Sequence, residues 1–125
     1  MTGITVYRGP MGSIMGFRVA GHARARVKTG GDIVCSAISV MAYTAVNAME
    51  TVAGVVTQPR EEDGLLEVFL PRDMTEQQEH DCQIILRTAL QGFSDIEQGY
   101  PRHARVVWKE WREHHAETES ATVRP

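Results

Sequence analysis

The spacing of hydrophobic and polar residues changes several times along this chain of 125 residues. Short apolar stretches, most of them alternating with polar residues, are typical of β-strands. Each is followed by glycine, proline or a run of polar residues, which indicates a turn. The pattern predicts five strands, over residues 4–8, 15–20, 55–58, 65–70 and 104–109.

Between the second and third of these strands the apolar residues follow the period of a helix. The predicted helix, residues 33–53, is apolar nearly all round, carries no charge before Glu50, and ends at Gly54. Such a helix must be covered on more than one side, and a small domain offers little material for that. We therefore expect part of the cover to come from a second copy of the chain, in a homodimer.

A second helix is predicted to end at about Gln98, and its apolar stripe keeps the helical period through Gly92. We therefore expect one continuous helix rather than two. Its start fits a capping box in either of two registers, Thr75 with Gln78 or Asp73 with Glu76.

The predicted order of elements is ββαββαβ, and several connections are too short for a parallel crossover. This favours an α+β fold in which a mainly antiparallel sheet packs against two helices. Residues 1–111 would form a single domain. Residues 112–125 are polar and are expected to form a disordered tail.

Composition and charge exclude several classes of function. The net charge is −3 and the basic residues are scattered, which argues against binding of a nucleic acid backbone. The sequence shows neither a signal peptide pattern nor about 18 consecutive apolar residues, so we expect a cytoplasmic protein outside the membrane. Cys35 and Cys82 lack zinc-ligand spacing and are expected to be reduced thiols, with no metal or other cofactor.

The chemistry that the chain could perform centres on Cys35. With Asp32 as the N-cap, this cysteine would lie in the first turn of the first helix. The helix dipole favours a thiolate by only about 0.3 to 1 kcal/mol, so the thiol needs a base. His22, at the end of the second strand, is the best placed. Backbone N–H groups of the first turn could stabilise an oxyanion, and the class of reaction would be acyl transfer, most simply peptide hydrolysis.

Each of these residues also has a non-catalytic interpretation. A cysteine at the start of an apolar helix is commonly buried in the core, and His22 could lie on the polar face of a longer strand. Asp32 could cap the helix or orient His22. Ser39 could hydrogen-bond in a site or back to its own helix. On spacing alone, the non-catalytic interpretation is the commoner one.

Several motifs together resemble the ribosomal-processing cysteine protease family, Prp. They are Gly21-His22-Ala23, a glycine-containing loop, Gly31-Asp32-Ile33-Val34-Cys35, Ala37, Ser39 and Val46-Asn47-Ala48. The loop is one residue longer than is usual in that family, and Ser36 stands where alanine is usual. The resemblance implies a homodimeric enzyme that removes the N-terminal extension of large-subunit ribosomal protein twenty-seven from its precursor.

By this resemblance His22 would be the general base, Cys35 the nucleophile, and Asp32 and Ser39 supporting residues. Residues 24–31 would order over an extended peptide, with hinges and contacts supplied by a set of nearby residues. This set is Gly21, Ala23, Arg24, Arg26, Lys28, Gly30 and Gly31. The alternative function is a non-enzymatic, dimeric, ribosome-associated interaction protein with a buried and inert Cys35.

Overall fold

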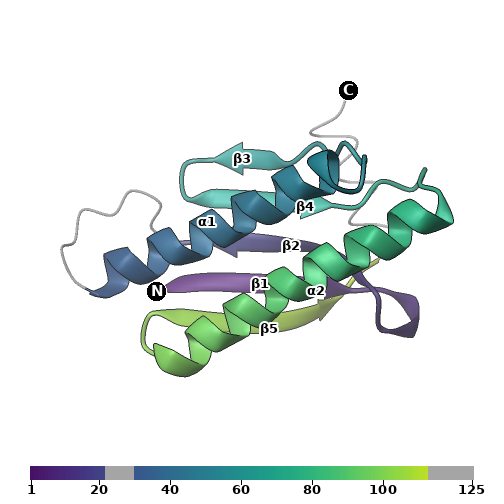
Figure 1. Cartoon of the computed structure of the whole chain (residues 1–125). Coiled ribbons are helices and arrows are strands. Elements are labelled where there is room, and N and C mark those ends of the chain that lie inside the picture. The colour runs from purple at the N-terminus through teal and green to yellow at the C-terminus, as the bar shows by residue number, and fades with distance from the viewer. Residues whose placement is uncertain (22–29, 113–125) are drawn as a thin grey trace.

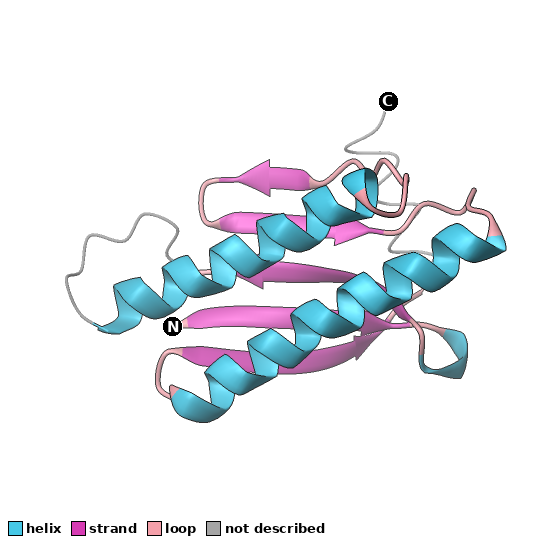
Figure 2. Ribbon diagram, viewed as in Figure 1, coloured by secondary structure: helices cyan, strands magenta, loops and turns pink. Residues whose placement is uncertain are grey.

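The structure is a computed structural model, and it describes residues 1–21 and 30–112. One five-stranded sheet carries two long helices on the same face (Figures 1 and 2). Expressed in chain order, the elements are β1 (Thr2–Arg8), a short 3-10 turn η1 (Pro10–Gly12), β2 (Ile14–Ala20), α1 (Gly30–Thr51), β3 (Arg60–Glu62), β4 (Leu65–Phe69), α2 (Glu76–Gly99) and β5 (Ala104–Glu110). The predicted α+β class is confirmed.

The strands lie in the order β3-β4-β2-β1-β5. Three neighbouring pairs are antiparallel, and only β1 and β5 are parallel. The sheet is therefore mainly antiparallel, as the short connections indicate. The chain reaches β5 through α2, which is long enough to make the crossover that a parallel pair requires.

The prediction of the third strand was wrong. Residues 55–58 are not a strand, because the chain stays attached to the end of α1: Val55 N–H donates to the Met49 carbonyl at 2.8 Å, and Gly54 takes the left-handed conformation with φ of 71°. The strand forms instead at Arg60–Glu62, in the polar stretch between the third and fourth predicted strands. Its side chains are polar, so the apolar pattern gave no signal there.

The core lies between the helices and the sheet. From α1 it receives one stripe at helical spacing, made by Val34, Ile38, Ala42, Ala45 and Met49. The opposite side of this helix remains apolar and exposed, with Ile33 72% and Val40 66% accessible. A helix of this length and hydropathy could by those criteria alone cross a membrane, but a core helix meets the same criteria, and this one packs on the sheet.

The second helix begins and continues as predicted. Thr75 Oγ accepts from the Gln78 N–H at 3.1 Å, and Gln78 Oε1 accepts from the Thr75 N–H at 3.0 Å. The capping box thus uses this register and not that of Asp73. The helix passes through Gly92 without a break, and Met41 of α1 fills the space above this glycine.

Gly16 offers a direct test of the sheet packing. A Cβ there would lie 2.2 Å from the carbonyl oxygen of Val68 and 3.0 Å from Cα of Phe69, so β2 and β4 would have to separate. We expect Gly16→Ala to lower the free energy of unfolding by about 1 to 3 kcal/mol, measured by urea denaturation. Gly99→Ala is the matched control, because nothing lies within 4 Å of that position. Equal denaturation midpoints for the two variants would contradict the close approach of the strands.

Candidate active site

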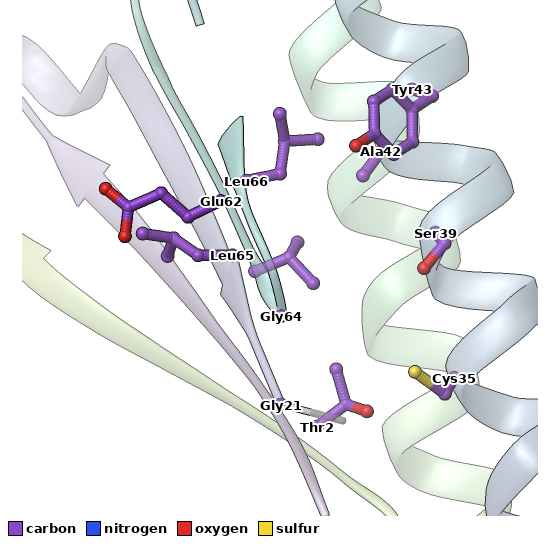
Figure 3. A pocket seen from close by; sticks show the side chains of 11 residues that line it. Thr2, Gly21, Cys35, Ser39, Ala42, Tyr43, Glu62, Gly64, Leu65 and Leu66 are labelled. Carbon is purple, nitrogen blue, oxygen red and sulfur yellow. The ribbon is translucent and has the colours of Figure 1, made fainter. Parts of the chain in front are cut away.

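A cavity of about 70 Å³ lies between α1 and the sheet (Figure 3). Its first wall is a row of side chains one helical turn apart on α1, namely Cys35, Ser39 and Tyr43, with Ala42 beside them. The facing wall comes from the start of β1, the end of β2 and the β3–β4 hairpin. The residues of this second wall are Thr2, Val19, Gly21, Glu62, Gly64, Leu65 and Leu66.

Cys35 lies deeper in its helix than predicted. Because α1 begins at Gly30, Cys35 is the sixth helical residue and belongs to the second turn. The prediction that Asp32 caps the helix was therefore wrong, since Asp32 is itself helical. In a helix the N–H of Cys35 bonds to the carbonyl four residues earlier, so it is not available to an oxyanion. The side chain is 9% exposed, and its sulfur points into the cavity (Figure 3).

Ser39 shares this helix face with Cys35. It is half-buried, and its hydroxyl is directed into the cavity (Figure 3). Within residues 1–21 and 30–112 the hydroxyl makes no hydrogen bond, so the alternative in which it bonds back to its own helix is not what the structure shows. Its position leaves it able to bond to a molecule that enters the cavity.

Gly21 explains how the end of β2 reaches the cavity. A Cβ there would lie 3.0 Å from Cα of Thr2 and 3.1 Å from the Met1 carbonyl oxygen, so only glycine fits without a shift. Its N–H also donates to the Gly64 carbonyl at 3.0 Å. The strand end is therefore fixed against β1 and against the β3–β4 turn, in the cavity that contains Cys35.

The next residue in the chain is His22, which lies outside the described residues. The same holds for Ala23, Arg24, Arg26 and Lys28. Gly30, Gly31 and Asp32 belong to the first turn of α1. The structure thus brings together Gly21, Cys35 and Ser39 among the residues singled out in the sequence.

Tyr43 was not recognised in the sequence. Its hydroxyl donates to Glu61 Oε2 at 2.7 Å and so connects α1 to β3 across the end of the cavity. This hydrogen bond, together with burial, raises the pKa of Tyr43 above its usual value. The available signal was its position eight residues after Cys35, which places both on one helix face.

A second polar contact holds the same hairpin from the other side of the sheet. Glu67 of β4 is buried, and its Oε2 accepts from the Tyr7 hydroxyl at 2.9 Å. Arg60 Nη1 of β3 lies 3.5 Å from Glu67 Oε1. Burial, and then the charge and hydrogen bond of Glu67, raise the pKa of Tyr7 to about 12. The adjacent residue in β4, Leu66, lines the cavity, so this contact helps to set its wall.

Cys82 has a different environment from Cys35. It is fully buried on the core side of α2, and this burial raises the pKa of its thiol. Cys82 is therefore a residue of the hydrophobic core. In the described part of the chain no three His, Cys, Asp or Glu residues lie together in a way that could hold a metal ion.

The Cys35 thiol points into a cavity that also contains Gly21, the residue before His22. This arrangement is suited to a cysteine nucleophile. The sequence matches the family model described as cysteine protease Prp over residues 1–105. The protein is a cysteine protease, and the chain belongs to the Prp family. Among curated proteins no significant match was found.

Several solved structures share the fold. The chain is 25% identical to SMU.848 from Streptococcus mutans, with a TM-score of 0.75 and coverage of 89% of this chain and 96% of that one. It is 22% identical to the ribosomal processing protease Prp from S. aureus in complex with a substrate peptide, with a TM-score of 0.75 and coverage of 87% and 100%.

The Tyr7–Glu67 contact predicts a pH dependence of stability. Between pH 10 and 12 the folded state holds the phenolic proton that the unfolded state has lost, so the free energy of unfolding should fall with rising pH, by about 2 to 3 kcal/mol in total. Urea denaturation at several pH values from 9 to 12 would measure this. In Tyr7→Phe the decline should be shallower, because this variant lacks the Tyr7 hydroxyl. The other groups that titrate in this range are present in both proteins. Equal slopes would contradict the assignment.

Proposed function

We propose that this protein is a cytoplasmic endopeptidase that removes the N-terminal extension of bacterial large-subunit ribosomal protein twenty-seven. The observation that carries the proposal is the cavity in which Cys35 faces Gly21, the residue before His22. Membership of the Prp family and the fold shared with a ribosomal processing protease support it.

In the proposed mechanism His22 removes the proton from the sulfur of Cys35. The thiolate adds to the carbonyl carbon of the scissile peptide bond, and the carbonyl oxygen becomes an oxyanion. When the C–N bond breaks, His22 returns its proton to the amine that leaves. Water then hydrolyses the thioester, which releases the removed extension with a free carboxylate and restores the thiol of Cys35.

Asp32 and Ser39 are proposed as supporting residues. Asp32 is a first-turn residue of α1 whose carboxylate could orient the His22 imidazole, a role that remains open to it because it does not cap the helix. Ser39 could donate or accept a hydrogen bond to the bound peptide, because its hydroxyl is directed into the cavity (Figure 3). No cofactor is required for these steps.

The central prediction is cleavage of the ribosomal protein precursor at one site by the wild-type protein and not by Cys35→Ala. The substitution removes the sulfur that forms the thioester, so the expected loss of rate is at least about 10³-fold. Mass spectrometry of the precursor after incubation measures both the site and the extent of cleavage. Cleavage by both proteins would mean that Cys35 is not the nucleophile.

The alternative is a non-enzymatic interaction protein in which Cys35 is inert. Iodoacetamide separates the two, because a thiol that is activated by His22 reacts in the folded protein near neutral pH, and more slowly in His22→Ala. Cys82 serves as the internal control, since a fully buried thiol should react only after denaturation. Equal slow reaction of both cysteines, with no cleavage of the precursor, would favour the alternative.

We further propose that the enzyme is a homodimer. The two helices leave a groove of about 310 Å³ on their outer side, with no charged residue in its lining. It is bounded by Met41, Thr44, Ala45, Ala48, Ile84, Ile85, Thr88 and Ala89. The exposed apolar residues of α1 continue this surface, and a second copy would remove it from water.

Sedimentation at micromolar concentration should show a dimer for the wild-type protein. Ile84→Glu should shift it toward the monomer, because Ile84 lines the groove and is 52% exposed. Val107→Glu is the matched control: Val107 is 43% exposed on β5 and does not line the groove. A wild-type monomer would exclude the dimer, and dissociation by both substitutions alike would place the interface elsewhere.

A further inference from the structure

Thr2 is a buried polar residue that the sequence patterns did not single out. It is the first residue of β1, and its side chain lines the cavity opposite Cys35 (Figure 3). Only 4% of its surface is exposed. Its backbone N–H donates to the His103 carbonyl at 2.9 Å, but its hydroxyl makes no hydrogen bond with any residue that the structure describes.

Such a hydroxyl needs an explanation, because buried polar groups nearly always have a partner. Packing does not explain why a threonine is present. The next residues on the same face of β1 are Ile4 and Val6, and valine would fill the space of Thr2 with a side chain of the same shape. A threonine here stabilises the folded state less than a valine should, unless its hydroxyl bonds to something that is absent from the resting enzyme.

The position of the hydroxyl is well defined by its neighbours. Its oxygen lies 3.2 Å from the point that a Cβ on Gly21 would occupy. It is therefore against the strand end that precedes His22, and it faces the cavity that the sulfur of Cys35 enters (Figure 3). A carbonyl group attacked by this sulfur would lie between the sulfur and the two strand ends.

The proposed reaction requires a hydrogen-bond donor at that place. The backbone N–H of Cys35 is committed to its helix, and the Tyr43 hydroxyl donates to Glu61. In the part of the cavity that the structure describes, the side-chain hydroxyls left to serve a substrate are those of Thr2 and Ser39. Of the two, Thr2 lies on the wall of the cavity opposite the sulfur of Cys35. The oxyanion would point away from the sulfur and therefore toward Thr2.

We propose that Thr2 is a further catalytic residue, whose hydroxyl donates a hydrogen bond to the carbonyl oxygen of the scissile peptide bond. This inference rests on the proposed protease function. As the bond from sulfur to carbon forms, the π electrons of the carbonyl move to its oxygen. The hydrogen bond from the Thr2 hydroxyl then becomes stronger, because the oxygen that accepts it becomes negatively charged. Thr2 keeps its proton throughout. When the amine leaves with the proton carried by His22, the carbonyl re-forms and this interaction weakens again.

The test is Thr2→Val, which removes the donor and keeps the shape. With the precursor peptide as substrate, we expect kcat to fall by about 10- to 100-fold and KM to change by less than about twofold, because the bond is made chiefly in the transition state. The urea denaturation midpoint should equal or exceed that of the wild type, since the lost hydroxyl has no partner in the resting enzyme.

Two further variants make the result specific. Thr2→Ser keeps a donor and should retain kcat within about threefold of the wild-type value. Thr5→Val removes a hydroxyl from the same strand on the face away from the helices, and it should leave cleavage unchanged.

An unchanged kcat in Thr2→Val would overturn the proposal. A lower denaturation midpoint of Thr2→Val, together with an equal loss of rate in Thr2→Ser, would also overturn it. These two results would indicate that the Thr2 side chain affects the rate through packing. If the wild-type protein itself does not cleave the precursor, the protease proposal fails first and that of Thr2 with it. Slow cleavage by a stable Thr2→Val, with Thr2→Ser active, is the supporting outcome.

Discussion

The packing of one stripe of α1 on the sheet is the constraint on which the rest of the structure depends. Ile38, Ala42 and Met49 are completely buried, so the rotation of the helix about its axis cannot change without exposing them. The row that contains Cys35, Ser39 and Tyr43 borders this stripe and is fixed by it. Because consecutive residues are about 100° apart around a helix, a slip of one position would turn the sulfur away from the cavity. The core therefore decides where the nucleophile points.

The other wall of the cavity is held by polar contacts, because β3 has few apolar side chains to bury. Glu61 is joined to α1 through Tyr43, and Arg60 is joined to Glu67, which Tyr7 contacts in turn. A three-residue edge strand has little stability of its own. These contacts on both faces of the sheet hold β3 in place, and the turn at Gly64 is joined to Gly21 by a backbone hydrogen bond.

The sequence patterns correctly predicted features that depend on contacts between residues close in sequence. The capping box of Thr75 and the helical period through Gly92 concern residues close in sequence, and both were confirmed. The third strand was misplaced because its partner, β4, lies beyond the turn and because its own side chains are charged, so no apolar pattern marked it. Asp32 looked like a cap because aspartate is a preferred N-cap residue, yet the helix starts two residues earlier, at Gly30. Thr2 could not be found from the sequence at all, since its neighbours in the cavity come from β2 and α1.

Polar groups outside the cavity show how unusual its hydroxyls are. Gln83 satisfies both backbone groups of Ile14, donating at 2.7 Å and accepting at 2.8 Å, and Tyr7 has its partner in Glu67. Thr2 and Ser39 have none within the described residues. Folding alone would favour apolar side chains at such places, and active sites are where proteins depart from that rule. The unsatisfied hydroxyls beside Cys35 are thus best understood as groups arranged for a bound peptide, whose arrival completes the hydrogen bonding that the folded chain leaves open.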